Sequence, residues 1–266
     1  MKYGMPTLIE LGTIRAHAEL AQKLSLDFIE INMSFPEYTP SAIDIGELRA
    51  IAREYGVFYT IHADEYLNPF DFEYEVSECY FSVMKRTLEV ARQIGARVVN
   101  LHLQKGIYIT LPDKVVLLTD IRREQYLRRV REFIALCERT LEGTDIIVAI
   151  ENVDTNPFSK SQLEALEYFM ASDRFALTLD TGHEMKLGFA DTPVFLAYPE
   201  KVRHMHLHDC KDGKPHLALG EGEVDIDGRL AMVRGDTCLV EVKTVSGLLT
   251  SVDYLNQSRK FNTGKR

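Results

Sequence analysis

Short β-rich runs alternate with stretches of helical periodicity along the chain. The strand-like runs occupy residues 2–8, 27–32, 57–62, 97–103, 145–151, 175–180, 202–208 and 239–243. Stretches whose apolar residues recur every three or four positions lie between and after them, at residues 13–24, 42–55, 74–94, 121–141, 161–170, 192–197, 226–233 and 246–255. Strands that alternate with helices predict a parallel sheet. Eight such units predict an α/β protein with a single (β/α)8 TIM barrel domain over residues 1–266.

An open, doubly wound sheet is the alternative architecture. That fold normally carries a Gly-x-Gly-x-x-Gly loop after an early strand, and this sequence has none. Gly56, Gly95 and Gly143 follow predicted helices, where a glycine supplies the left-handed residue that ends a helix. The pattern therefore favours the closed barrel.

One connection is longer than the others. Residues 104–120, between the fourth strand and its helix, place alternating apolar residues on both sides of Pro112 and Asp113. This arrangement predicts a β-hairpin. On a barrel such an insertion would stand at the mouth, where it would act as a lid.

Histidines and acids stand at the ends of successive predicted strands. They are His62, His102, Glu151, Asp180 with His183 just beyond it, His206 and Glu241. In a barrel enzyme the carboxyl ends of the strands surround the active site. The two-residue period of a strand turns these polar side chains inward and their apolar neighbours outward. We therefore expect the set to converge inside the mouth of the barrel.

Three members of this set, Glu151, Asp180 and Glu241, are acids. Carboxylates that converge without a cation repel one another and take up protons. Buried charges also cost several kcal/mol unless they are paired or metal-bound. A divalent metal ion removes both conflicts, so the pattern predicts a metal site.

The remaining histidines and one further acid have separate expectations. His17 lies on a predicted helix and is expected at the surface, whereas His204, deeper in the seventh strand, is expected to be a hydrogen-bonded core residue. His208 suits a lining role and a ligand role equally. Glu30, at the end of the second strand, suits a substrate contact or a salt bridge, and the sequence does not decide between them.

Composition narrows the class of protein. The net charge of −9 disfavours a broad nucleic-acid-binding surface, which normally needs a basic stripe. No apolar run approaches the ~18 residues of a membrane span, and the N-terminus lacks a signal-peptide pattern, so a cytoplasmic location is expected. The four scattered cysteines, Cys79, Cys137, Cys210 and Cys238, are expected to be buried free thiols.

At these residues the chain resembles the xylose isomerase-like TIM-barrel superfamily, which joins sugar isomerases and epimerases to endonuclease IV. The resemblance covers nearly the whole chain. Its motifs are Ile-Glu-Asn at 150–152, Leu-Asp-Thr-Gly-His at 179–183, His-Leu-His-Asp at 206–209, His-Leu-Ala-Leu-Gly-Glu-Gly-Glu-Val-Asp at 216–225 and Val-Glu-Val at 240–242. These motifs are specific for the superfamily and much less so for the reaction.

The resemblance implies a metal-dependent sugar or sugar-phosphate isomerase or epimerase. The metal ligands would be Glu151, Asp180, His206 and Glu241, and the two glutamates would also transfer the proton through an enediolate. His183 and His62 would contact substrate hydroxyls or a phosphate. An oxygen-rich ligand set suits Mn, Mg or Co. The expected partner is a small sugar or sugar phosphate, with no membrane and with a homodimer left open.

The alternative within the superfamily is a zinc-dependent phosphodiesterase similar to endonuclease IV. The matching positions would be His62, His102, Glu151, Asp180, His183, His206, His216 and Glu241. Lys214 stands where that family has an aspartate, which puts its third metal in doubt, and Gly182 replaces that family's cysteine in the Asp-Thr-Cys-His motif. His102 supports this alternative, because many sugar epimerases do not need a histidine there.

The glycines of residues 220–223 and Lys243 give weaker signals, and a non-catalytic barrel is a third class of function. The glycines of residues 220–223 are interpreted as a turn that positions His216, and only weakly suggest a phosphate cradle. Lys243 is expected to point inward, where it would meet a phosphate or neutralise the carboxylates. A non-catalytic binding barrel would be expected to have lost one of the four predicted ligands, and all are present.

Overall fold

Eight parallel strands close into a barrel, which confirms the predicted fold class. The computed structural model describes residues 1–235 and 237–258. Around the barrel the order is β1 (Lys2–Pro6), β12 (Thr237–Val240), β9 (Val202–Leu207), β8 (Phe175–Asp180), β7 (Ile147–Glu151), β4 (Val98–His102), β3 (Phe58–His62) and β2 (Phe28–Asn32), which pairs with β1 again. All the strands run in the same direction, so their carboxyl ends meet at one face.

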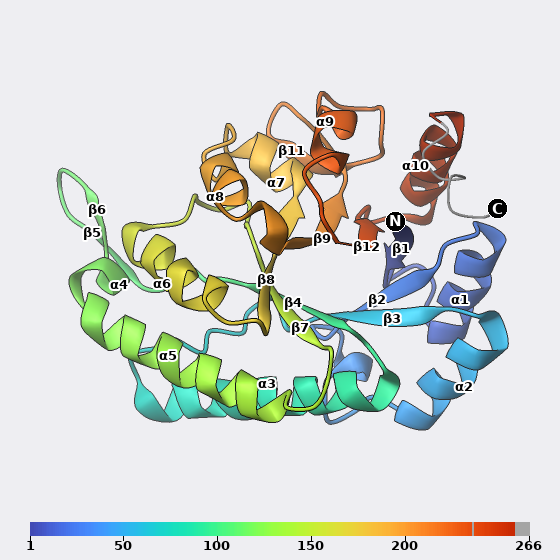
Figure 1. The fold of residues 1–266 in the computed structure, drawn as a ribbon. Coiled ribbons are helices and arrows are strands. Elements are labelled where there is room, and N and C mark those ends of the chain that lie inside the picture. The colour runs from blue at the N-terminus through green and yellow to red at the C-terminus, as the bar shows by residue number, and fades with distance from the viewer. Residues whose placement is uncertain (236, 259–266) are drawn as a thin grey trace.

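Helices cover the outside of the barrel (Figure 1). They are α1 (Ile14–Lys23), α2 (Ile45–Tyr55), α3 (Tyr74–Ile94), α4 (Leu118–Ile121), α5 (Arg123–Thr140), α6 (Lys160–Met170), α7 (Thr181–Lys186), α8 (Thr192–Ala197), α9 (Ile226–Leu230) and α10 (Val245–Gln257), with short 3-10 turns at Pro36–Tyr38 and Pro199–Lys201. The long helices α3 and α5 pack side by side along one flank. Gly56 and Gly95 end α2 and α3 with φ of 70° and 75°, as predicted for a left-handed helix end.

Below the polar strand ends, the inside of the barrel is partly apolar. Val98, Ala149 and Ala176 form a small apolar cluster there. The Phe28 ring fills the space next to β1, where a Cβ on Gly4 would lie 2.3 Å from it. Gly4 therefore leaves room for an aromatic plug at the amino-terminal end.

The eighth strand ends earlier than its sequence pattern predicts. Residues 239–243 were expected, but the ladder runs over Thr237–Val240. The Glu241 N–H still donates to the carbonyl of Leu207 at 3.0 Å, so Glu241 stays attached to β9 just beyond the strand. Side-chain alternation continues past the last ladder pair, and the sequence pattern could not mark where pairing stops.

Several short elements were not predicted. Asp180 caps α7, because its carboxylate accepts the N–H of His183, and β10 (Asp209–Lys211) pairs with β11 (Lys214–Leu217) as a small hairpin. The hairpin at residues 104–120, by contrast, was predicted: β5 (Tyr108–Thr110) pairs antiparallel with β6 (Val115–Leu117), and both project from the body near α4 (Figure 1). A lid role for this hairpin stays a prediction.

Two expectations about single side chains are wrong. His17 is buried, not exposed: its Nδ1 lies 2.6 Å from the Thr13 carbonyl and its Nε2 accepts the Leu8 N–H at 2.7 Å. Cys79 is exposed, while the other three cysteines are buried free thiols as expected. In the described part of the chain, no helix is both long enough and apolar enough to cross a membrane.

Candidate metal centre and active site

Four predicted ligands converge inside the carboxyl-terminal mouth of the barrel. Glu151 ends β7, Asp180 ends β8, His206 lies on β9 and Glu241 follows β12. One ligand atom from each lies within 4.8 Å of the others. The Nδ1 atom of His206 is central: it is 3.0 Å from Glu151 Oε1, 3.0 Å from Glu241 Oε2 and 3.9 Å from Asp180 Oδ2.

The charges of this group depend on one another. Burial tends to raise the pKa of Glu151, but His206 and His102 outweigh it and hold that pKa well below its usual range. Burial also tends to raise the pKa of Glu241, while Lys243 and His206 hold it low. Burial lowers and the surrounding carboxylates raise the pKa of His206, with a net result well above the ordinary value.

The donor set fits a divalent cation. His206 Nδ1 can carry one proton, yet two carboxylate oxygens face it at 3.0 Å, and Glu241 Oε2 has no hydrogen-bond partner among the described residues. An ion in contact with these oxygens would satisfy all of them at once. Three carboxylate groups and one imidazole are oxygen-rich donors of the kind that Mn and Mg prefer.

His62 and His102 gather on the second oxygen of Glu151. His102 Nε2 lies 3.1 Å from Glu151 Oε2 and His62 Nε2 lies 3.4 Å from it, and the Asn100 amide donates to the same oxygen. The Nδ1 of His62 faces the Ala63 carbonyl at 2.7 Å. Burial lowers the pKa of His62, but contact with Glu151 outweighs it and raises that pKa to about 9.

His183 and His216 lie on the opposite side of the site. His183 Nδ1 is 3.1 Å from the Asn152 carbonyl and 3.4 Å from Asp180 Oδ2. His216, on β11, meets His183 in a T-shaped contact with ring centroids 5.3 Å apart, and burial lowers the pKa of His216 to about 4. Both rings line the mouth. The predicted substrate-binding histidines therefore form two pairs, His62 with His102 and His183 with His216, next to the four ligands.

His208 is held by two hydrogen bonds. Its Nε2 lies 2.9 and 3.0 Å from the two oxygens of Asp180, and its Nδ1 accepts the backbone N–H of His216 at 2.8 Å. These contacts suit a role in orienting Asp180, but His208 also belongs with His183 and His216 to a group that could hold an ion, so both expected roles stay open. A Cβ at residue 182 would lie 2.1 Å from the His208 ring, so Gly182 is required by this imidazole.

The glycine-rich run at residues 220–223 encloses a carboxylate of the chain itself. Asp209 accepts backbone N–H groups from Gly220 at 3.0 Å, Gly222 at 2.9 Å and Val224 at 3.0 Å. This contact fixes the loop that follows β11 and agrees with the interpretation as a turn. Sequence analysis missed Asp209, whose only signal was its place next to His208 in the His-Leu-His-Asp motif.

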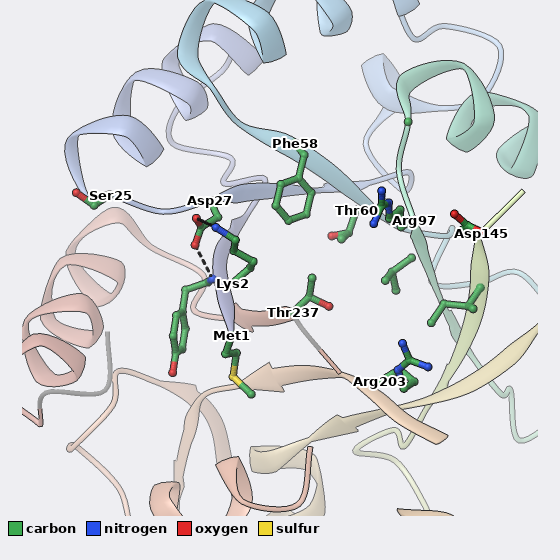
Figure 2. A pocket seen from close by; sticks show the side chains of 14 residues that line it. Met1, Lys2, Ser25, Asp27, Phe58, Thr60, Arg97, Asp145, Arg203 and Thr237 are labelled. Atoms are coloured by element: carbon green, nitrogen blue, oxygen red, sulfur yellow. Dashed lines mark hydrogen bonds and ion pairs between the residues drawn. The ribbon is translucent and has the colours of Figure 1, made fainter. Parts of the chain in front are cut away.

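The barrel is hollowed at both ends. The mouth holds a cavity of about 490 Å³ that reaches His62, His183, Glu241 and Lys243. A larger cavity, about 860 Å³, lies at the amino-terminal end, and Figure 2 shows Thr60 and Thr237 between Lys2 on one side and Arg97 and Arg203 on the other. The larger one is remote from the converging acids, so the smaller one is the candidate active site.

Comparison with known proteins identifies the family to which the chain is similar. The family described as xylose isomerase-like TIM barrel matches residues 18–249, whereas no curated protein gives a significant match. A D-tagatose 3-epimerase-like protein is 21% identical over 98% of this chain and 97% of that chain, with a TM-score of 0.77. The 3-keto-D-glucoside 4-epimerase from E. coli is 17% identical over 97% and 99%, with a TM-score of 0.73. The IolI protein with a bound zinc atom is 18% identical over 98% and 96%, with a TM-score of 0.72.

At these identities the solved structures establish a shared fold. The family match is stronger, because it spans most of the chain and includes each of the converging residues from Glu30 to Glu241. The chain belongs to the xylose isomerase-like TIM barrel family.

Proposed function

We propose that the protein is a divalent-metal-dependent sugar isomerase or epimerase. The observation that carries this proposal is the pair of buried glutamates, Glu151 and Glu241, which flank His206 Nδ1 at 3.0 Å each. Two carboxylates on either side of one point suit proton removal from one carbon and return to another carbon or face. The names of the sugar epimerases with the same fold support this reaction class.

Glu151, Asp180, His206 and Glu241 would hold the ion. A divalent cation there would polarise the substrate carbonyl and lower the cost of the negative charge that follows proton loss. The chain's own groups then divide the work. Glu151 and Glu241 take up and return the proton at a carboxylate oxygen, while His208 keeps Asp180 in place through its bonds of 2.9 and 3.0 Å.

The lining of the mouth favours an uncharged sugar over a sugar phosphate. Among the described residues that line this cavity, Lys243 alone carries a permanent positive charge, and its Nζ is already 2.6 Å from Glu241 Oε1. Glu65 and Asp154 add negative charge to the rim. A phosphate would normally call for an arginine fork or several lysines. His102 and His183, which also line the cavity, instead offer ring nitrogens suited to hydroxyl groups.

One observation favours a second candidate, a phosphodiesterase. His62 and His102 approach Glu151 Oε2 at 3.4 and 3.1 Å, and with Glu151 they form another group able to hold an ion. Nitrogen-rich sites of this kind favour zinc. Two zinc ions per chain, with cleavage of abasic DNA, would support this candidate in place of the epimerase.

The test begins with metal content per chain after purification without chelator. About one Mn, Mg or Co per chain, with isomerisation of an unphosphorylated ketose in the presence of that metal, is the expected result. Glu151→Gln and Glu241→Gln should each lower kcat by about 10²–10⁴-fold on the substrate so found. Asp145→Asn, an exposed acid at the other end of the barrel, is the control and should leave kcat unchanged. Full activity in both glutamine variants would sink the proposal.

A further inference from the structure

A buried chain of polar side chains runs beneath the candidate metal centre. Glu30, on β2, is 2% exposed and lies between two histidines of β9. Its Oε2 is 3.1 Å from His204 Nε2 and accepts the Thr60 hydroxyl at 2.7 Å. Its Oε1 is 3.0 Å from His206 Nε2. This carboxylate therefore touches the ring of a candidate ligand on the side away from the site.

Glu30 and His206 approach each other through two buried polar atoms. His206 Nε2 and Glu30 Oε1 lie 3.0 Å apart, and neither atom forms a hydrogen bond within the described part of the chain. Their separation is that of a hydrogen bond, so a proton on Nε2 would pair the two atoms once it points at the oxygen. Buried polar groups are costly to leave unpaired, which favours this pairing.

The rest of the chain holds Glu30 in place. His204 bonds Glu30 through Nε2, and its Nδ1 lies 2.7 Å from the Thr237 hydroxyl. Thr60 and Thr237 both line the cavity at the amino-terminal end of the barrel (Figure 2). The connected polar groups thus span the barrel interior from this cavity to the mouth. Two fixed donors on Oε2 leave Oε1 directed at His206.

We propose that Glu30 is a positioning residue that keeps the proton of the His206 ring on Nε2 and so presents Nδ1, unprotonated, to the metal ion. The inference rests on the proposed function, because it assumes that His206 is a ligand. The physical reason is general: a metal-bound imidazole donates its other N–H to a carboxylate, which fixes the ring's tautomer and orientation and strengthens its donor nitrogen.

The geometry decides between the two roles that the sequence left open for Glu30. Glu30 also lines the mouth cavity, but both of its carboxylate oxygens face groups of the barrel interior, which favours the role of an internal partner. A salt bridge alone would not require the chain of bonds that ends on a ligand nitrogen. Glu30 therefore acts on the site through His206.

The test compares metal affinity in Glu30→Gln and in the matched control Thr178→Val. Thr178 is also fully buried, and its hydroxyl has no hydrogen-bond partner among the described residues, so its loss should leave the site intact. Mn²⁺ and Zn²⁺ titrations of the full chain should show about 10–100-fold weaker binding in Glu30→Gln, and wild-type affinity in Thr178→Val. Wild-type affinity in Glu30→Gln would overturn the inference.

A second measurement covers the case in which Glu30→Gln does not fold. Nitrogen-15 NMR of the wild-type protein loaded with Zn²⁺ should show His206 protonated at Nε2, with a slowly exchanging proton. A proton on Nδ1 in the loaded protein would overturn the inference. Failure of the wild-type protein to bind metal would instead count against the proposed function, so the two failures are distinguishable.

Discussion

The two ends of the barrel differ in what their hollows contain. The amino-terminal cavity is larger, but its charged residues are exposed or paired at the rim, as Lys2 is with Asp27 at 2.9 Å. At the carboxyl-terminal end, buried acids and histidines approach one another within 4.8 Å in a smaller space. Exposed charges interact weakly with one another, whereas buried charges must be matched. Buried charged groups that must be matched by their neighbours therefore identify the candidate site, whereas the size of a cavity does not.

Each end of the barrel contains a glycine packed against a ring, so the same change, glycine to alanine, can be made at both ends. Gly182 lies against the His208 ring at the mouth, and Gly4 lies against the Phe28 ring at the other end. Neither residue has a positive φ, so in both cases the extra methyl group acts only through the side chain that it meets.

The largest effect is expected for Gly182→Ala. The new Cβ would lie 2.1 Å from His208, which must move and release Asp180. Overpacking of this kind costs about 1–3 kcal/mol, and loss of the bond that orients a ligand weakens metal binding by about 10–100-fold. Thermal unfolding and Mn²⁺ titration measure the two effects. Unchanged metal affinity would show that His208 has no part in orienting Asp180.

Gly4→Ala is expected to change stability alone. Its Cβ would lie 2.3 Å from the Phe28 ring, so unfolding should be easier by about 1–3 kcal/mol in denaturant titrations. Metal stoichiometry should stay at the wild-type value, since the Phe28 plug lies at the far end of the barrel from the ligands. If metal binding fell as much as in Gly182→Ala, the two ends would not be independent.

The smallest effect concerns His17, which lines neither cavity. Burial lowers the pKa of His17, so the folded state keeps its ring neutral and bonded to Leu8. A lowered pKa of this kind gives stability that is present above the unfolded value, about 6.5, and that is lost as pH falls toward the folded value. Loss of the Leu8 bond is worth about 1 kcal/mol. The melting temperature of His17→Gln should therefore depend less on acid pH than that of the wild type; equal slopes would contradict this.

The sequence predicted those site residues whose inward direction follows from the alternation of side chains along a single strand. Glu151, Asp180 and His206 end or occupy predicted strands with apolar neighbours, and the structure brings these side chains together inside the barrel. Eight strand–helix units sufficed for the closed fold, because short parallel connections leave few other arrangements.

What the sequence could not predict depends on register between strands. Glu30 meets His204 and His206 only because β2, β1, β12 and β9 are neighbours with a particular stagger. Burial of His17 depends on a loop carbonyl and a strand-end N–H that no periodicity reports. The need for Gly182 comes from a ring twenty-six residues away, which has no local signature.

The cradle around Asp209 has a consequence for protein engineering. Three backbone N–H groups of one loop and that of Cys210 donate to the carboxylate of Asp209, so this site is occupied by an anion of the chain itself. Concave sets of backbone N–H groups bind anions from solution equally well. Replacing Asp209 by a residue with a shorter side chain would leave these N–H groups able to bind formate or acetate. Binding of the small carboxylate would then order the loop, and that ordering could be measured.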